Sequence, residues 1–161
     1  MADRNIISAD FSEIRGLIIK SRASERKRAL HLVRSSHVEN PGIMFNCLQP
    51  GTYVRPHMHP QEDGKEILIA LQGSLKAVIF DTLGCVTKTY DISPQKTVFI
   101  EIPSKTYHSS VAMEKDSVVC ELYLGYYREE SYKSFAPWAP AEENKEEAGR
   151  YLEELLGKIN R

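Results

Sequence analysis

Short runs of β-forming residues follow one another through the middle of this chain, between residues 41 and 127. Turn residues such as Pro50-Gly51 and Gly73 separate the runs. About eight short strands at this spacing are typical of a β-sandwich or barrel, and not of a parallel α/β sheet. We therefore expect a mainly β fold built from GIMFNCLQ, TYVRPHMH, EILIALQG, SLKAVIFD, CVTKTYDI, TVFIEIP, YHSSVAM and SVVCELYLGYY.

A helix is predicted toward each end of the chain. Asp10 and Glu13 have the spacing of a capping box, and apolar residues then recur at helical spacing. Pro140 is placed to begin the second helix, and the acids of AEENKEE suit the positive end of its dipole. This helix would pack on its own domain or on a second subunit through one apolar stripe of Ala148, Tyr151, Leu152, Leu155, Leu156 and Ile159.

Length and charge limit the classes to which the protein can belong. The 161 residues suffice for one domain with its own core, and no repeat or linker divides them. We predict an N-terminal helix and connection over residues 1–40, a barrel over 41–127, and a lid-like segment with a C-terminal helix over 128–161. A net charge of −1 gives no basic excess for binding nucleic acid. No apolar run reaches the ~20 residues that insert across a membrane.

The N-terminal residues and the cysteines favour a cytoplasmic location. MADRNIISADFSE carries charges where a signal peptide would be apolar, so secretion is not expected. The three cysteines, Cys47, Cys85 and Cys120, contain no C-x-x-C pair, and their odd number argues against a disulfide framework. Each stands among strand-like residues, which predicts small buried side chains and not nucleophiles.

The stretch RPHMHPQEDGKE, residues 55–66, raises the question of a metal site. If residues 52–59 are extended, alternate side chains share a face, and His57 and His59 point the same way. Two imidazoles at this spacing suit a transition metal. Glu66 opens the next predicted strand and is placed to join them across the loop PQEDGK. The alternative is a polar loop that is rich in histidine.

A third histidine, His108, follows a Pro-led turn in EIPSKTYHS. A single histidine in a strand is more often a hydrogen-bonded core residue than a metal ligand. The metal interpretation gains weight here only because the other three groups need a further partner.

These residues together resemble the cupin superfamily. Its first motif is similar to Gly51, His57-x-His59, Glu66 and Gly73, and its second to Pro103 followed by His108. The loop before Glu66 is longer than the usual motif, and Lys105 stands where the second motif usually has glycine. The resemblance implies a double-stranded β-helix (jelly-roll) barrel that holds one metal ion by His57, His59, Glu66 and His108.

A closer resemblance extends from about Arg26 to Glu143. LQPGTYVRPHMHPQEDGKEILIALQGSLKAVIFD, EIPSKTYHS and YKSFAPWAPAEE together look like the WbuC-type cupin-fold metalloproteins. The segment FAPWAPAE is not a general cupin feature, so it makes the resemblance specific. WbuC-type proteins are found near genes for O-antigen and lipopolysaccharide biosynthesis, and the resemblance supplies a fold and a metal without a reaction.

The implied ligand set narrows the choice of metal. Three imidazoles and one carboxylate, without thiolate, suit one divalent Fe, Mn, Ni, Co or Zn ion. In an octahedral ion they leave two positions for water, substrate or dioxygen. No cysteine falls at a ligand position.

Strand alternation also gives Arg55 and Tyr53 a place on the face of His57. Arg55 would bind a substrate carboxylate or phosphate, or else pair with an inward acid such as Glu101 or Glu121. Tyr53 would donate a hydrogen bond at the rim of the pocket or pack in the core, and we favour packing.

Other side chains receive roles beside this site. Glu101 and Tyr107 are the candidates for a general acid or base. FAPWAP, with Phe135 and Trp138, would cover the barrel mouth as a lid or anchor the connection to the last helix, and we favour the anchor. The two remaining histidines, His31 and His37, lie in the polar N-terminal connection and are interpreted as surface or capping residues.

Two classes of function follow from these features. One is a metal-dependent enzyme that acts on a sugar or sugar-nucleotide by isomerisation or epimerisation, or an oxygenase that uses the two open positions. The other is a non-catalytic sugar-binding or regulatory cupin. A homodimer is expected in both cases, through the terminal helix or an edge strand.

Overall fold

The computed structural model describes residues 7–35, 40–126 and 128–160. No helix in these ranges is long and apolar enough to cross a membrane. Their elements run in the order α1 (Phe11–Ala23), β1 (Arg28–Arg34), β2 (Gly42–Leu48), β3 (His57–Met58), β4 (Glu66–Gln72), β5 (Leu75–Phe80), β6 (Val86–Ile92), β7 (Phe99–Ile102), β8 (Tyr107–Ala112), β9 (Ser117–Tyr123), α2 (Glu129–Tyr132), β10 (Ser134–Phe135) and α3 (Lys145–Ile159).

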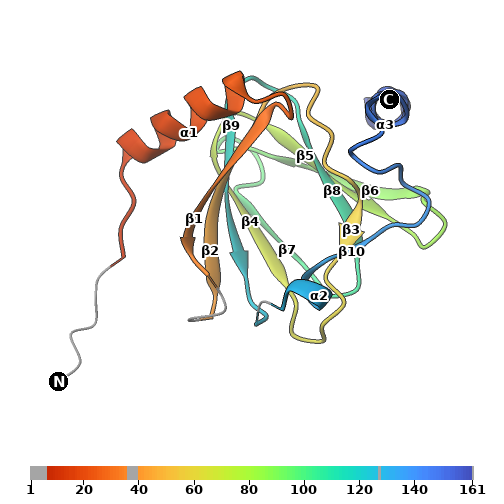
Figure 1. The fold of residues 1–161 in the computed structure, drawn as a ribbon, viewed down its shortest axis with the longest axis horizontal. Helices are drawn as coiled ribbons and strands as arrows, with labels where there is room; N and C mark the ends of the chain where they lie inside the picture. Colours follow the sequence, from red (N-terminus) through yellow and green to blue (C-terminus); the bar gives the residue numbers. More distant parts are fainter. Residues whose placement is uncertain (1–6, 36–39, 127, 161) are drawn as a thin grey trace.

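Two five-stranded antiparallel sheets form the body of the molecule (Figure 1). Their strand orders are β1-β2-β9-β4-β7 and β10-β3-β8-β5-β6. The core lies between them because each strand buries alternate side chains: Leu68 and Ala70 of β4 meet Leu75 and Ala77 of β5 in one apolar cluster. The predicted mainly β fold, with a helix toward each end, is confirmed.

Several short elements differ from the sequence prediction. Residues 28–34 form an edge strand, where we expected part of a polar connection. The run predicted over residues 52–59 is a strand only at His57–Met58, since Pro56 cannot donate a ladder hydrogen bond. The last predicted run ends as a strand at Tyr123, and its final residue lies outside the described residues. Both α2 and β10 were not predicted.

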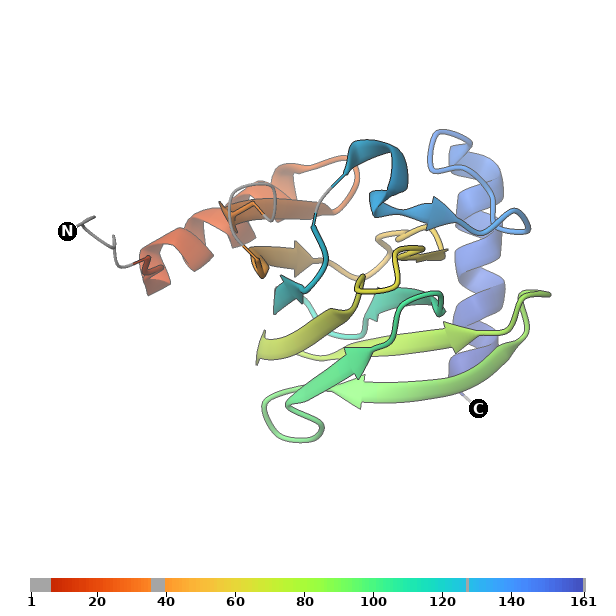
Figure 2. The ribbon, with the colours of Figure 1, turned by 90° about the horizontal axis from the view of Figure 1, so that it is seen from below.

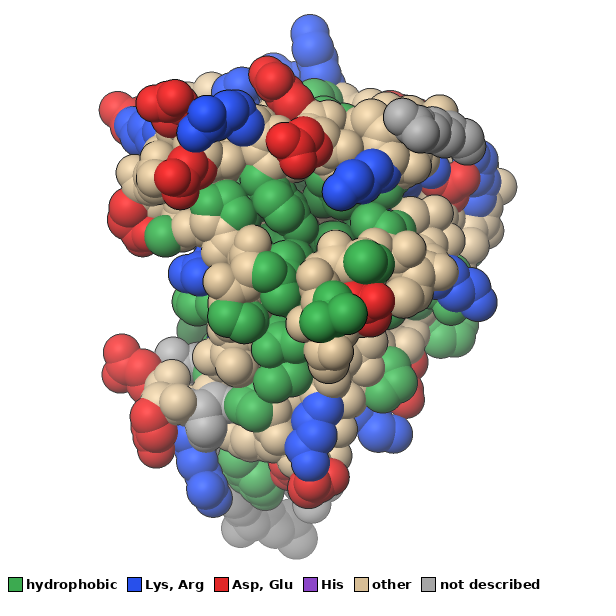
Figure 3. Space-filling model, turned by 90° about the vertical axis from the view of Figure 1, so that its right-hand side faces the viewer, with side chains coloured by type: hydrophobic (Ala, Val, Ile, Leu, Met, Phe, Trp, Pro, Cys, Tyr) green, Lys and Arg blue, Asp and Glu red, His purple; other side chains and the backbone are tan. Residues whose placement is uncertain are grey.

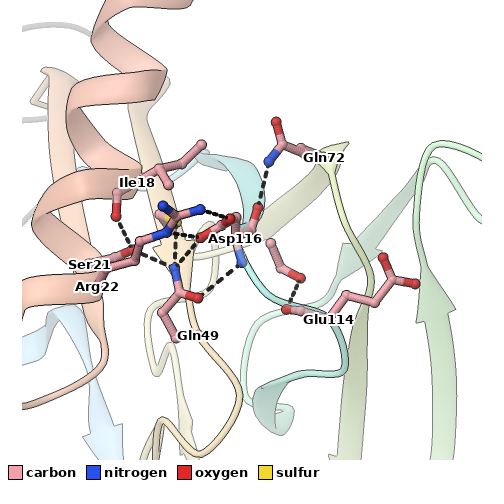
Figure 4. A network of polar contacts seen from close by, with 9 residues as sticks. Ile18, Ser21, Arg22, Gln49, Gln72, Glu114 and Asp116 are labelled. Atoms are coloured by element: carbon pink, nitrogen blue, oxygen red, sulfur yellow. Dashed lines mark hydrogen bonds and ion pairs between the residues drawn. The ribbon is translucent and has the colours of Figure 1, made fainter.

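A polar network attaches α1 to the barrel (Figure 4). The amide of Gln49 donates to the Ser21 hydroxyl and to the Asp116 carboxylate, both at 2.8 Å. Arg22 Nε donates to the same carboxylate at 2.8 Å, and Gln72 Nε2 donates to the Asp116 carbonyl at 3.1 Å. The predicted capping box of Asp10 and Glu13 begins this helix. One turn between β8 and β9 therefore holds both the helix and the sheet.

The C-terminal helix α3 covers the outer face of the sheet that contains β5 and β8 (Figure 2). It begins at Lys145 with Asn144 as its cap, so the prediction that Pro140 begins it is wrong. Its predicted stripe packs on Val78 and Phe80 of its own barrel and is not left for a second subunit. Figure 3 shows hydrophobic side chains gathered on this side of the molecule, below a border of charged ones. The homodimer stays a prediction.

Candidate metal centre

The structure brings His57, His59, Glu66 and His108 together inside the barrel. His57 lies on β3 and is paired in register with His108 on β8, while Glu66 opens β4 of the facing sheet. Each side chain is at least nine-tenths buried. One nitrogen or oxygen atom of each lies within 4.8 Å of the others. These four residues could hold a metal ion between the two sheets.

Backbone carbonyls orient all three imidazoles. A carbonyl oxygen only accepts, so each Nδ1 must carry a hydrogen, and each Nε2 is the nitrogen left to face inward. This is the arrangement that supporting hydrogen bonds give to metal-binding histidines. The Nδ1–O distances are 2.9 Å from His57 to Arg55, 2.7 Å from His59 to Tyr132 and 2.8 Å from His108 to Thr106.

The Nε2 atoms face inward without enough protein partners. Those of His57 and His59 are buried and have no hydrogen-bond partner, and that of His108 lies 2.9 Å from a Glu66 oxygen. Either a proton or a metal ion must lie between this nitrogen and the carboxylate, because two acceptors at this distance would repel each other. Burial lowers the pKa of His57 well below its usual range, so this ring binds as the neutral ligand. The donor set therefore fits a divalent transition ion.

Glu66 is an ionised ligand despite its burial. Burial alone would raise its pKa, but hydrogen bonds from the His108 and His59 rings outweigh this and hold the pKa of Glu66 well below the usual range. The carboxylate is thus the one negative group among the four residues.

The long loop of residues 60–65 returns the chain to the site. Gly64 N donates to Gln61 O at 3.0 Å, which closes the turn just before Glu66. At the other side of the loop, Lys105 N donates to His59 O at 2.8 Å. A Cβ on Gly64 would lie only 3.0 Å from the Tyr123 hydroxyl, so glycine permits the close approach. Both departures from the cupin motif, the longer loop and Lys105, meet here, since Lys105 has a positive φ of 60° and also pairs with Glu62.

Tyr53 lies apart from His57, whereas Arg55 contacts a ring that also lies against His57. Tyr53 donates its hydroxyl to Pro140 O at 2.9 Å and packs in the cluster under α3. The Arg55 guanidinium lies 4.9 Å from the centre of the Phe135 ring, and Phe135 in turn lies against His57. Residues 52–56 are not in a strand, so alternation does not place Tyr53 beside His57. The substrate-binding role of Arg55 stays a prediction.

The two acid–base candidates lie away from the four residues. Glu101 is on the outer face of β7, where it pairs with Lys65 at 3.3 Å. Tyr107 packs against Trp138 under α3, on the opposite face of β8 from His108. Neither side chain is positioned to exchange a proton at the candidate metal centre.

Glu121, which the sequence suggested only as an inward ion-pair partner for Arg55, is the acid that lies near the site. It lies on β9, is 8% exposed and accepts a hydrogen bond from Asn46 Nδ2 at 3.1 Å. Burial and the nearby Glu66 carboxylate raise the pKa of Glu121 to about 7. The available signal was its place two residues before Tyr123, on the inward face of a strand. No ion pair between Arg55 and either Glu121 or Glu101 exists among the described residues.

The aromatic residues of FAPWAP and the N-terminal histidines were also given roles from the sequence. Ser134–Phe135 pairs with β3, and Trp138 packs on Phe80, which favours the anchor interpretation of FAPWAP. His31 stacks on Phe45 on the outer side of β1 and lies 3.5 Å from Glu13. The other N-terminal histidine, His37, lies outside the described residues.

The cysteines contribute nothing to the centre. Cys47 is buried, and burial raises the pKa of its thiol, as it does for the half-buried Cys120. Cys85 is exposed in the turn before β6, so the prediction that it is buried is wrong. None of the three belongs to the group of possible ligands.

One protein family matches the N-terminal half of the chain, which includes His57, His59 and Glu66 but not His108. The family model described as Domain of unknown function (DUF6016) matches residues 9–92. No curated protein matches the chain in sequence.

Solved structures of cupin-fold proteins are similar to the barrel. KdgF from a Halomonas species has a TM-score of 0.50 at 21% identity, covering 64% of this chain and 83% of its own. Oxalate oxidase in complex with glycolate has 0.56 at 16%, covering 71% and 58%. The capsular polysaccharide assembling protein CapF from Staphylococcus aureus has 0.52 at 15%, covering 59% and 26%. The chain thus spans little more than half of the oxalate oxidase chain and a quarter of CapF. At these identities the likeness is one of fold.

Proposed function

We propose a function from the premise that this chain belongs to the family described as Domain of unknown function (DUF6016) and has a cupin fold. The protein is a metal-binding cupin that binds or converts a sugar or sugar-nucleotide intermediate of surface-polysaccharide synthesis, with His57, His59, Glu66 and His108 as ligands. A divalent Fe, Mn, Ni, Co or Zn ion matches this donor set.

The orientation of the three histidines carries the metal assignment. Each Nδ1 is bonded to a backbone carbonyl, so three Nε2 atoms converge with one carboxylate in a buried space. A histidine kept only for packing has no need of this shared orientation, and two buried ring nitrogens would remain without partners. A metal ion satisfies all of these atoms together.

The carbohydrate assignment is supported by resemblance and by the site's position. The chain resembles WbuC-type cupins, which implies a link to O-antigen synthesis, and CapF, described as assembling capsular polysaccharide, shares the fold. The ligand would be held at the inner end of the barrel, where Glu121 is the one buried carboxyl besides Glu66 among the described residues. When bound, the metal would supply Lewis acidity toward a carbonyl or hydroxyl.

Ligand substitution tests the proposal. We expect the full-length protein to hold about one metal ion per chain by elemental analysis, and His57→Ala or His59→Ala to lose it, because a four-residue site loses a neutral donor in each. His31→Ala is the matched control, since that imidazole lies on the outer side of β1. Metal retained at the wild-type level in both site variants would refute the assignment.

A ligand screen tests the carbohydrate part separately. The metal-loaded wild type would be heated with nucleotide-sugars and sugar phosphates, and stabilisation by at least one of them is expected because a ligand that binds only the folded state raises the melting temperature. The absence of any shift with these compounds, in a protein that holds its metal, would contradict the carbohydrate role and leave the metal site standing.

A further inference from the structure

A cavity of about 390 Å³ is lined by residues of β1, β2 and β9 and by residues at the end of α2. Figure 1 shows α2 at the lower end of the two sheets. The floor of the cavity contains Asn46, Glu121 and Tyr123, and Tyr132 and Lys133 border it from the end of α2. On β1, Leu30 and Leu32 form an apolar wall, and both are about half exposed because they face this opening. The cavity has both polar and apolar surfaces.

The cavity adjoins the candidate metal centre. The His59 ring lies 4.9 Å from the Tyr123 ring and 5.0 Å from the Tyr132 ring, measured between centroids. Both tyrosines line the cavity and both contact the His59 ring, so the cavity lies next to this imidazole. A molecule in this space would therefore lie beside the four residues of the centre.

The lining side chains have the chemistry of a sugar site. Asn46 donates to the Glu121 carboxylate at 3.1 Å, which leaves the remaining oxygens of this pair for hydroxyl groups. Tyrosine rings and leucines suit the apolar faces of a sugar ring. Lys133 lies over Tyr132 at 5.3 Å, and no ion pair to its ammonium occurs within the described part of the chain. Arg34 adds a second cation to the lining.

We propose that this cavity binds a monosaccharide-sized polyol with one anionic group, that Lys133 holds the anionic group, and that Glu121 with Asn46 holds hydroxyl groups. This inference rests on the proposed function and names the ligand class of its site. The volume lies near the lower end of the ~300–1,000 Å³ of small-molecule pockets, which suits a single ring and not a whole nucleotide-sugar. For a nucleotide-sugar, the sugar would enter the cavity and the nucleotide would remain outside.

A larger cavity of about 630 Å³ is a poorer candidate. It lies between α3 and residues 25–28, and none of the four residues of the centre lines it. Two of its arginines, Arg26 and Arg28, already pair with Glu142. Its charges thus join the C-terminal segment to the barrel.

Calorimetry with three probes tests the assignment on the metal-loaded, full-length protein. The probes are D-glucuronate, D-glucose 1-phosphate and neutral D-glucose, which separate a carboxylate from a phosphate and both from the ring. We expect the wild type to bind one or both anionic probes more tightly than glucose. Lys133→Met should weaken the anionic probes about tenfold or more, as for a lost charge-assisted hydrogen bond, and leave glucose unchanged. Glu121→Gln should weaken all three.

Lys88→Met is the matched control. Lys88 also lies over a tyrosine ring, Tyr90, at 4.7 Å, but it is exposed in a groove between β6 and β7. Its substitution should leave all three affinities unchanged. An equal loss in Lys88→Met, an unchanged affinity in Lys133→Met, or no binding of any probe by a metal-loaded wild type would each overturn the cavity assignment. Probe binding by a wild type that holds no metal would instead contradict the proposed function and leave the cavity assignment standing.

Discussion

At the scale of single residues, the geometry of the candidate centre depends on backbone groups that orient the ligating side chains. Three carbonyl oxygens set the tautomers of three imidazoles, and Gly64 allows the loop before Glu66 to lie against Tyr123. These supporting groups are backbone carbonyls and a glycine, so none of them supplies a side chain that could bind a metal. The binding geometry is therefore sensitive to changes at residues with no ligand atom of their own.

Gly64→Ala tests this dependence. A Cβ there would meet the Gln61 carbonyl and the Tyr123 hydroxyl, each at 3.0 Å, so the loop must shift and Glu66 with it. We expect metal affinity to fall about tenfold or more, as for other changes that disturb the support of a metal ligand. Competition with a chelator would measure the loss.

Gly149→Ala is the control for that substitution. Gly149 lies in α3, where an added Cβ would meet no atom within 4 Å, and alanine in a helix should stabilise by about 0.5–1 kcal/mol. Unchanged metal affinity in Gly64→Ala would show that the loop tolerates the added methyl group and that its path does not depend on glycine.

At the scale of elements, the sequence predicted the helices and strands that have a periodic pattern of apolar residues, and it missed short elements that have none. Alternating and helical periodicities identified α1, α3 and most strands. The resemblance to the cupin motifs predicted all four residues that the structure brings together. Alternation failed before His57, where Pro56 interrupts the strand, and so misplaced Tyr53. The two-residue β10 and one-turn α2 are too short for a periodic signal, although α2 borders the inferred cavity.

The attachment of α1 has a predictable pH dependence. The hydrogen bond from Arg22 holds the pKa of Asp116 below its usual range, so the pair stabilises the fold above about pH 4 and the contribution is lost as pH falls through the lowered pKa. Asp116→Asn should therefore reduce the urea midpoint at pH 7 and make little difference near pH 2. Asparagine also tolerates the positive φ of 58° at this position.

Arg22→Met should reproduce the result, because it removes the partner that lowers the pKa. An equal loss of stability at both pH values in Asp116→Asn would mean that hydrogen-bond geometry, and not charge, accounts for the effect.

At the scale of the whole molecule, the four residues connect the two sheets. His57 and His108 belong to one sheet and Glu66 to the other, so an ion between them would cross-link strands that otherwise meet through apolar side chains. Apolar side chains fill most of the space between the sheets, and we expect an ion to add to the stability that they provide.

Chelation should therefore lower the melting temperature without unfolding the barrel. At a metal concentration of about 100 times Kd, the bound ion contributes about 2.7 kcal/mol, which corresponds to about 5–10 °C for a chain of this length. Differential scanning calorimetry before and after chelation, and again after metal is restored, would measure the shift. An unaltered transition, with metal removal verified by elemental analysis, would show that the ion does not stabilise the fold.

The carbonyl that orients His59 belongs to Tyr132, which lies 73 residues further along the chain. All four ligating side chains precede this carbonyl in the chain, so the segment that completes their arrangement is synthesised after them. A chain that ends before α2 thus carries every donor atom but lacks the carbonyl that orients the His59 ring. We therefore expect stable binding of an ion to require the C-terminal segment as well as the four ligating residues.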